Sequence, residues 1–289
     1  MNGLDANTWR MGPTMRSSAN AWKAPVEVWA ILFRHRALIW QLTRREVIGR
    51  YRGSFIGVFW SIAQPIMLLA AYTFVFRFVF KARWSPEGES HSDFALMLFA
   101  GLIVCAVFIE SVNRAPSLIV HHANYVKKIV FPLETLPWIS VGAVLFHLGI
   151  GCVVLLGFQL ASGHALNWTA VTFPFLLVPV MLYVLGASWF LASIGVFVRD
   201  VGHAIGVLTN LMLFLAPVFY PLSSVPDPYR PLMYLNPLTF VVEQSRNVLI
   251  LGQLPSWSGL LVYSLCGVAV SSLGLIWFER TRKGFADVL

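Results

Sequence analysis

The sequence predicts an all-α, polytopic membrane protein with six transmembrane helices. Of its 289 residues, 57% are hydrophobic and 12% are charged, and the mean hydropathy is +0.71. So few charges cannot solvate a globular surface of this size. Residues 55–76 contain no acidic, basic or histidine side chain, and about 20 such residues in a helix cross a hydrocarbon core of roughly 30 Å.

Two helices are expected before the first span. Residues 1–24 are polar or small and lack the apolar core of a signal peptide, so they are interpreted as a cytoplasmic tail. Residues 25–40 mix Trp, Leu and Ile with Arg34, His35 and Arg36, as in a helix that lies in the headgroup layer. A second helix follows at residues 41–51, and the segment 25–53 leads into the membrane.

The membrane domain is expected over residues 54–278. Pro65 lies near the middle of the first span, where a proline removes a backbone hydrogen bond and predicts a kink. Apolar patches in the proline-rich segment 221–258 are too short to span, which predicts a re-entrant outer segment before the sixth span. The remaining expected spans are residues 94–112, 136–161, 171–198, 204–220 and 259–278, with a loop at 113–132 and a tail at 279–289.

Charge sets the expected orientation. With six spans, both termini lie on one side, and 16 of the 21 Lys and Arg residues fall on that side. Basic residues beside a span favour the cytoplasm, so both termini are expected to be cytoplasmic. The same distribution argues against nucleic-acid binding, since the net charge of +8 follows the ends of the apolar segments.

Several functions are disfavoured by missing motifs. The sequence has no GxxxxGK[ST] loop, so ATP binding of the P-loop type would need another chain. No acidic or basic residue lies in the middle of a span, which disfavours ion coupling, and the lone His147 is typical of a packed histidine. His121 and His122 lack metal-ligand spacing, and the absence of DxD, HxxxxD or clustered acids disfavours an embedded glycosyl- or acyltransferase.

Two residue clusters have a functional and a structural interpretation. Arginine forks suit a phosphate or pyrophosphate, but positive charge beside a span is also explained by orientation alone. Aromatic rings can stack on sugars along a path, but from the residues alone a lipid-facing position is favoured. The basic cluster comprises Arg44, Arg45, Arg50, Tyr51 and Arg52, and the aromatic series begins Phe55, Phe59, Trp60, Tyr72, Phe74 and Phe76.

The order of motifs resembles the ABC-2 type permeases that export polysaccharide. The resemblance rests on RREVIGRYRGSFIGVFWSIAQPI, then NYVKKIVFPLETLP, VRDVGH, and finally FYPLSSVP with YLNPLTFVVEQSRNVLI. It covers about residue 42 to the C-terminus, and the first 40 residues are an extension. Within the class, lipopolysaccharide O-antigen export permeases are the nearest match, and capsule and teichoic-acid export permeases are relatives.

The resemblance implies a transport subunit that is not itself an enzyme. It implies a homodimer in the bacterial inner membrane, with a cytoplasmic ABC ATPase subunit that binds ATP and Mg. The substrate implied is undecaprenyl-diphosphate-linked polysaccharide, and the alternatives are another glycan or a small lipid or drug. By resemblance, Arg44 to Arg52 form a gate helix near the pyrophosphate, and the first and fifth spans line the channel. The coupling segment contacting the ATPase is Asn124, Tyr125, Val126, Lys127, Lys128 and Ile129.

Overall fold

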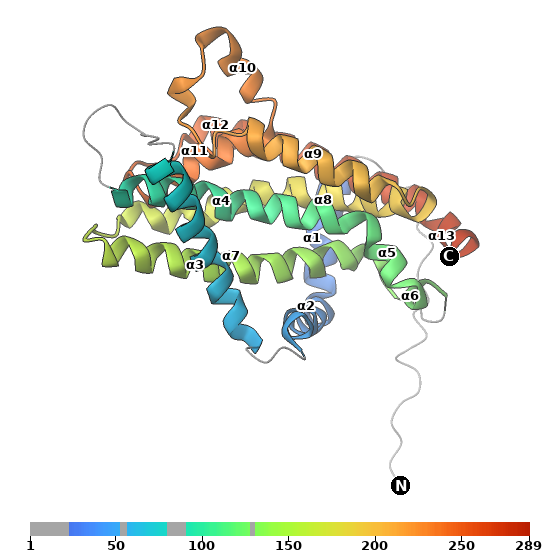
Figure 1. Cartoon of the computed structure of the whole chain (residues 1–289). Coiled ribbons are helices and arrows are strands. Elements are labelled where there is room, and N and C mark those ends of the chain that lie inside the picture. Colours follow the sequence, from blue (N-terminus) through green and yellow to red (C-terminus); the bar gives the residue numbers. More distant parts are fainter. Residues whose placement is uncertain (1–22, 53–56, 80–90, 128–130) are drawn as a thin grey trace.

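The computed structural model describes residues 23–52, 57–79, 91–127 and 131–289, and every regular element in them is helical. Long helices lie roughly side by side along one axis, and shorter helices cross or cap them (Figure 1). The C-terminal ends of α4 and α12 define the basic end of the bundle, which carries Arg114, Arg199, Arg280 and Arg282. The opposite end is called the far end.

Four helical stretches are long and apolar enough to cross a membrane. They contain α4 (His91–Arg114), α7 (Leu136–Ala161), α8 (Phe173–Phe197) and α12 (Trp257–Thr281). Two expected spans are shorter, namely α3 (Trp60–Tyr72) and α9 (Val201–Leu215). The helical class and four spans are confirmed, while the count of six stays a prediction.

The first predicted span differs from a single α-helix. A 3₁₀ turn at Gly57–Phe59 precedes α3, and the chain continues beyond Tyr72 as a π-helix over Thr73–Val79. Pro65 lies inside α3, as expected. Hydropathy alone does not predict the change from α to π hydrogen bonding, because an apolar segment suits either kind of helix.

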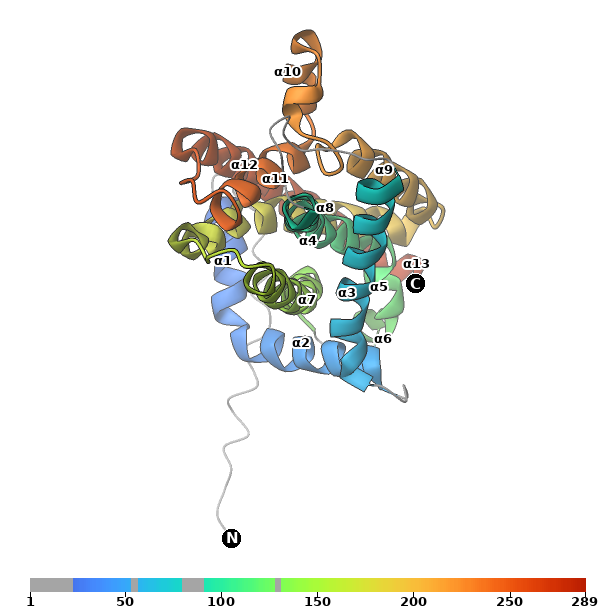
Figure 2. The same cartoon turned by 60° about the vertical axis from the view of Figure 1, so that its left-hand side comes forward.

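Helices α1 (Ala24–Arg34), α2 (Arg36–Tyr51) and α3 surround α7 on three sides (Figure 2). The break between α1 and α2 lies at His35, earlier than the break predicted between residues 40 and 41, and no Gly or Pro marks it. Thr43 of α2 donates to the Ile139 carbonyl of α7 at 3.4 Å. A Cβ on Gly142 would lie 2.8 Å from the Thr43 hydroxyl, so this glycine allows the close crossing.

Helices α8 and α12 approach backbone to backbone. A Cβ added to Gly274 would lie 2.2 Å from the Gly186 carbonyl oxygen, and one added to Gly186 would lie 2.5 Å from the Val270 carbonyl oxygen. Small residues permit such contacts between membrane helices, where packing replaces the hydrophobic effect. The two helices form the most extensive interface in the described bundle.

The segment before α12 forms a cap near the far end, and part of it projects sideways from the long helices (Figure 1). It contains short turns at Leu222–Ser224 and Asp227–Tyr229, the projecting α10 (Arg230–Met233), and α11 (Pro237–Leu249) (Figures 1 and 2). Asn236 begins α11, since its side chain accepts from the Leu238 N–H at 3.0 Å. One face of α11 is buried against α4 and α8. Its position relative to a bilayer stays a prediction.

A buried arginine fixes this cap. Arg246 of α11 is 2% exposed, and its guanidinium donates to the carbonyls of Met97 at 2.8 Å, Pro217 at 2.5 Å and Val218 at 2.7 Å. Glu243 lies 3.4 Å from Nη1. The three-residue spacing of Glu243 and Arg246 indicates only that these two side chains pair, whereas the structure adds carbonyls from two distant segments.

Replacing Arg246 by Lys is expected to destabilise the protein by about 2–4 kcal/mol, because one ammonium cannot reach carbonyls on three sides and buried acceptors lose their donors. Thermal unfolding of the purified chain in detergent measures the change. Arg199→Lys is the matched control, since Arg199 is exposed at the α8–α9 turn. Equal midpoints for both variants would contradict the role of Arg246.

Candidate functional site

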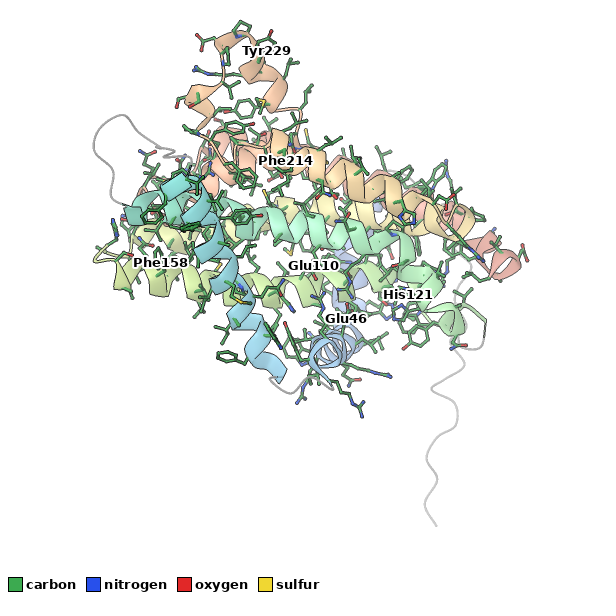
Figure 3. The ribbon with its side chains drawn as sticks, viewed as in Figure 1. Glu46, Glu110, His121, Phe158, Phe214 and Tyr229 are labelled. Carbon is green, nitrogen blue, oxygen red and sulfur yellow. The ribbon has the colours of Figure 1, made fainter. Side chains whose placement is uncertain are left out.

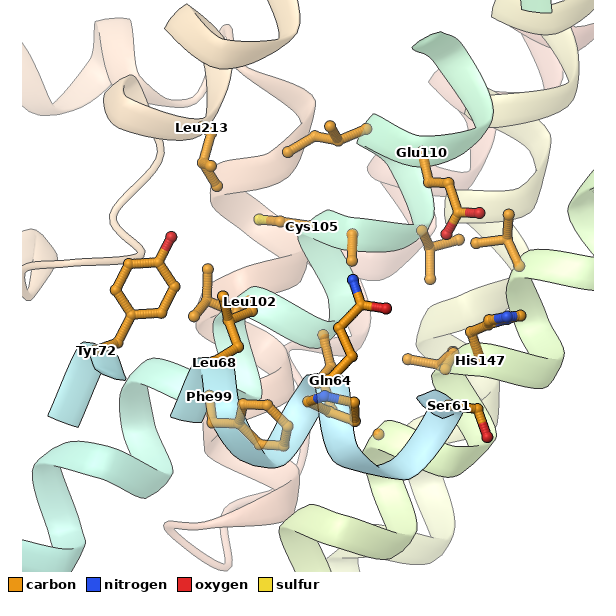
Figure 4. A pocket seen from close by; sticks show the side chains of 18 of the residues that line it. Ser61, Gln64, Leu68, Tyr72, Phe99, Leu102, Cys105, Glu110, His147 and Leu213 are labelled. Atoms are coloured by element: carbon orange, nitrogen blue, oxygen red, sulfur yellow. The ribbon is translucent and has the colours of Figure 1, made fainter. Parts of the chain in front are cut away.

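A cavity of about 680 Å³ lies between α3, α4 and α7, and the last turn of α2 borders it. Glu110, His147 and Ser61 lie toward one side of the close view, and Tyr72 and Leu213 toward the other (Figure 4). Arg50 and Tyr51 contact the side with Glu110 and His147, which is called the polar mouth. The rest of the lining is mainly apolar and includes Leu68, Phe99, Leu102, Ile103 and Leu148.

Tyr51 and His147 hold α2 against α7 at the polar mouth. The Tyr51 hydroxyl lies 2.9 Å from His147 Nε2, and the two rings stack with 5.9 Å between centroids. His147 Nδ1 lies 3.3 Å from the Ala143 carbonyl, which can only accept. These partners fit a ring with its proton on Nδ1, so that Nε2 accepts from Tyr51.

The Tyr51 phenol suits this donor role at neutral pH. Burial raises the pKa of Tyr51 above its usual range, and the neighbouring Arg50 charge opposes that rise. A raised pKa keeps the phenol protonated throughout the physiological range. The hydroxyl is therefore available as a hydrogen-bond donor, either to His147 or to an anion at the mouth.

An ion-pair ladder joins α2 to α4. Arg50 lies 2.5 Å from Glu110, and Arg114 contacts Glu46. Glu110 is also 3.8 Å from Arg114, one helical turn along α4. Helix α2 crosses α4 at a steep angle (Figures 1 and 2), so that Glu46 faces Arg114 and Arg50 faces Glu110. Figure 3 labels Glu46 near Glu110. Two carboxylates and two guanidiniums give this ladder no net charge.

A second cavity of about 500 Å³ lies on the other side of the ladder, toward the basic end. It lies among α2, α4, α7, α5 (Leu118–His121) and α6 (Ala123–Lys127). His122 contacts the Leu118 carbonyl at 2.8 Å and stacks on Tyr125 with 5.4 Å between centroids. No cluster of three potential metal ligands occurs in the part of the chain that the structure describes. The polar lining is Arg45, Glu46, Arg114, Ser117, His121, His122 and Tyr125.

The predicted basic cluster does not converge on one point. Arg50 and Tyr51 line the first cavity, whereas Arg45 lines the second. Arg44 and Arg52 are exposed. Arg44, Arg45 and Arg52 form no ion pair with any residue in the described ranges. A role in pyrophosphate binding stays a prediction for all five residues.

The aromatic residues predicted to line a channel also lie in different places. Tyr72 lines the first cavity and its ring lies 5.7 Å from that of Phe219. Phe59, Trp60 and Phe74 are exposed on the single chain, by 62%, 41% and 61%. Phe55 lies outside the described residues, as does the side chain of Phe76. Whether the exposed rings meet lipid or a second subunit stays a prediction.

The predicted coupling residues lie at the basic end, around α6. Asn124 is exposed, and Tyr125 stacks on Phe131 with 4.5 Å between centroids. Val126 is half-buried against the core. Lys127 ends α6, and Lys128 and Ile129 lie outside the described residues. Contact with another protein stays a prediction.

Sequence analysis does not name the ladder residues Glu46, Glu110 and Arg114, and it interprets His147 only as a packed histidine. A signal exists for the three ladder residues. The spacing Glu-x-x-x-Arg occurs in EVIGR at residues 46–50 and again in ESVNR at residues 110–114. Such pairs lie on one helix face. Their pairing across helices depends on how α2 packs, which the spacing does not give.

Comparison with known proteins identifies a family and relatives. Residues 37–250, more than half of the chain, match the ABC-2 type transporter membrane family. The chain is 29% identical to an O-antigen export system permease protein RfbA of Myxococcus xanthus, over 89% of this chain and 96% of the relative. It is 22% identical to an RfbA of Klebsiella pneumoniae, over 86% and 93% of the two chains. It is also 22% identical to the polysialic acid transport protein KpsM of Escherichia coli, over 83% and 91%.

Tyr51→Phe is expected to lower the stability of the protein by about 1 kcal/mol, because His147 Nε2 loses its closest donor. The thermal unfolding midpoint in detergent measures the loss. Tyr229→Phe removes a hydroxyl from a ring that is 60% exposed and is the control, with no change expected. A Tyr51→Phe midpoint equal to wild type would contradict a stabilising contact.

Proposed function

The chain belongs to the ABC-2 type transporter family, and from this premise we propose that it is the permease subunit of an ATP-driven exporter of lipid-linked polysaccharide. The similarity to polysaccharide-export permeases over most of the chain carries this conclusion. The relatives include permeases for two kinds of polymer, O-antigen and polysialic acid, so the class of cargo is polysaccharide. An undecaprenyl diphosphate anchor and an O-antigen-like glycan are the specific substrate proposed.

The polar mouth is the proposed contact site for the anchor's diphosphate. Arg50 and Tyr51 can donate to phosphate oxygens there, and guanidinium forks match them well. Arg44, Arg45 and Arg52 add positive charge along the same helix, which attracts an anionic headgroup to the membrane surface. The apolar remainder of the cavity would exclude charged groups from its inner part.

The energy source is proposed to be a separate ABC ATPase that binds ATP and Mg. The sequence has no P-loop of its own. The coupling segment around α6 lies at the basic end, where a cytoplasmic partner is expected by the distribution of charge. The same argument supports cytoplasmic termini, and the similarity to polysaccharide-export permeases supports a bacterial inner-membrane location.

A homodimer is part of the proposal. Exposed apolar side chains run along α9, including Val207, Leu211 and Phe214, and others lie on α3. A second copy packed on this surface would place α3 and α9 around a shared path for the polymer. The exposed aromatic rings of Phe59, Trp60 and Phe74 would then face sugar rings.

The double variant Arg50→Ala, Arg52→Ala is expected to block export, reducing surface polymer at least about tenfold, because it removes two phosphate donors. The variant should still fold, since Glu110 keeps Arg114 as a neighbour. Immunoblotting of surface polysaccharide measures export. The matched control is Arg34→Ala, Arg36→Ala, which removes two exposed arginines near the α1–α2 break. Normal surface polymer in the Arg50, Arg52 variant would remove the proposed diphosphate role.

Purification of the tagged chain from its native host is expected to recover a P-loop ATPase at a ratio of one to one. Mass spectrometry of the complex should also detect a polyprenyl-diphosphate glycan. Recovery of the chain alone in gentle detergent would contradict the ATP-driven class. Stimulation of ATP hydrolysis by small amphiphiles but not by glycan would support the alternative, export of a small lipid or drug.

A further inference from the structure

Arg50 is not free to bind an anion in this structure. Its guanidinium already lies 2.5 Å from the Glu110 carboxylate, and both side chains are partly buried, at 24% and 31% exposed. Arg44 and Arg45 of α2 and Arg52 at its C-cap have no ion-pair partner among the described residues. Within the described part of the chain, the arginine that lines the first cavity is therefore the neutralised one.

If an anion displaced Glu110 from Arg50, the partly buried Glu110 carboxylate would be left without an ion-pair partner unless another cation paired with it. Leaving one partner of such a pair without compensation is unfavourable, because its charge keeps the loss of hydration and loses the attraction that offset it. Arg114 lies one turn further along the same helix, with its Nη1 3.8 Å from Glu110. That distance is too long for a hydrogen bond but is spanned by a side-chain rotation.

Arg114 has a vacant donor for this purpose. Its Nη2 contacts Glu46, whereas Nη1 is a buried nitrogen with no hydrogen-bond partner among the residues that the structure describes. Buried donors are normally paired, so an unpaired one requires an explanation. The carboxylate of Glu110 is the neighbouring acceptor that could satisfy it. Glu110 thus has two available partners, Arg50 and Arg114 Nη1.

We propose that Glu110 is a positioning residue that moves from Arg50 to Arg114 when a diphosphate-bearing lipid reaches the polar mouth. The carboxylate occupies the place of the anion at Arg50 until substrate arrives, and Arg114 accepts it afterwards. This inference rests on the proposed function and deepens it, because it assigns residues that control access of the anion to Arg50.

The exchange also reaches the basic end of the bundle. Arg114 is the last residue of α4, and a turn at Ala115–Ser117 leads directly into α5 and α6. Arg114 also lines the second cavity together with His121 and Tyr125. Occupancy at Arg50 is thereby linked to the charge environment next to the coupling segment.

The resting pair is tested without any ligand by phenylglyoxal labelling of arginines in the full chain, reconstituted in phosphatidylcholine nanodiscs. Peptide mass spectrometry should find Arg50 labelled about three- to tenfold more slowly than Arg44, as expected for a partly exposed ion pair. Glu110→Gln should raise Arg50 labelling to the Arg44 level. Glu27→Gln, which removes an exposed pair with Arg34, should leave it unchanged.

The exchange itself is tested by binding of geranylgeranyl diphosphate to the same nanodiscs. Glu110→Gln should bind about three- to tenfold more tightly than wild type, because no carboxylate competes for Arg50. Arg114→Gln should bind more weakly by a similar factor, because Glu110 then has no second cation with which to pair when it leaves Arg50. Arg114→Lys should restore near-wild-type affinity, and Glu27→Gln should match wild type. Thermal unfolding establishes that each variant is folded.

The outcomes distinguish a failure of the proposed Glu110 exchange from a failure of the proposed diphosphate binding. Unchanged Arg50 labelling in Glu110→Gln would overturn the resting pair, whatever the lipid does. Affinity that shifts in the same direction in Glu110→Gln and Arg114→Gln, or in neither, would overturn the exchange while leaving diphosphate binding intact. A third outcome is that no variant binds geranylgeranyl diphosphate, although Glu110→Gln raises the labelling of Arg50. This result would refute the diphosphate role and the exchange, and it would still support the Arg50–Glu110 pair.

Discussion

Hydrocarbon offers no hydrogen-bond partner to a peptide group, and this constraint governs the structure. The described chain satisfies it with helices. Where a helix ends near other spans, side chains must supply the missing donors. At the end of α9, Arg246 donates to the carbonyls of Pro217 and Val218, and Asn236 donates to that of Met212 at 2.7 Å. The cap over the far end is thus held by polar contacts within an apolar bundle.

The same constraint explains why charges near the bundle occur in compensated groups. Glu46, Arg50, Glu110 and Arg114 sum to zero, and each is only partly exposed. A neutral group of this kind can rearrange internally at lower cost than a single buried charge can be uncovered. The ladder lies between the first cavity and the second, so rearrangement on one side alters the polar lining of the other.

Hydropathy predicts much of the scaffold but little of the site. The span expected at residues 136–161 coincides with α7, since a long uncharged segment has few alternatives in a membrane. The predicted break between residues 40 and 41 lies later than the observed one at His35, because no neighbour of His35 is a residue that disrupts a helix. Arg246 bonds to Met97, and Tyr51 to His147, across long separations in the chain. Such contacts depend on how helices cross, which local pattern does not encode.

The shortness of α9 has a consequence for the bilayer. Its 15 residues extend about 22 Å, less than the roughly 30 Å of a typical hydrocarbon core. Helix α9 borders the first cavity and exposes Leu211 and Leu215 to its surroundings. Thinning of the adjoining lipid is one way in which a bilayer accommodates such a hydrophobic mismatch. A hydrated polymer passing beside α9 would then meet a thinner hydrocarbon layer than beside the four longer spans.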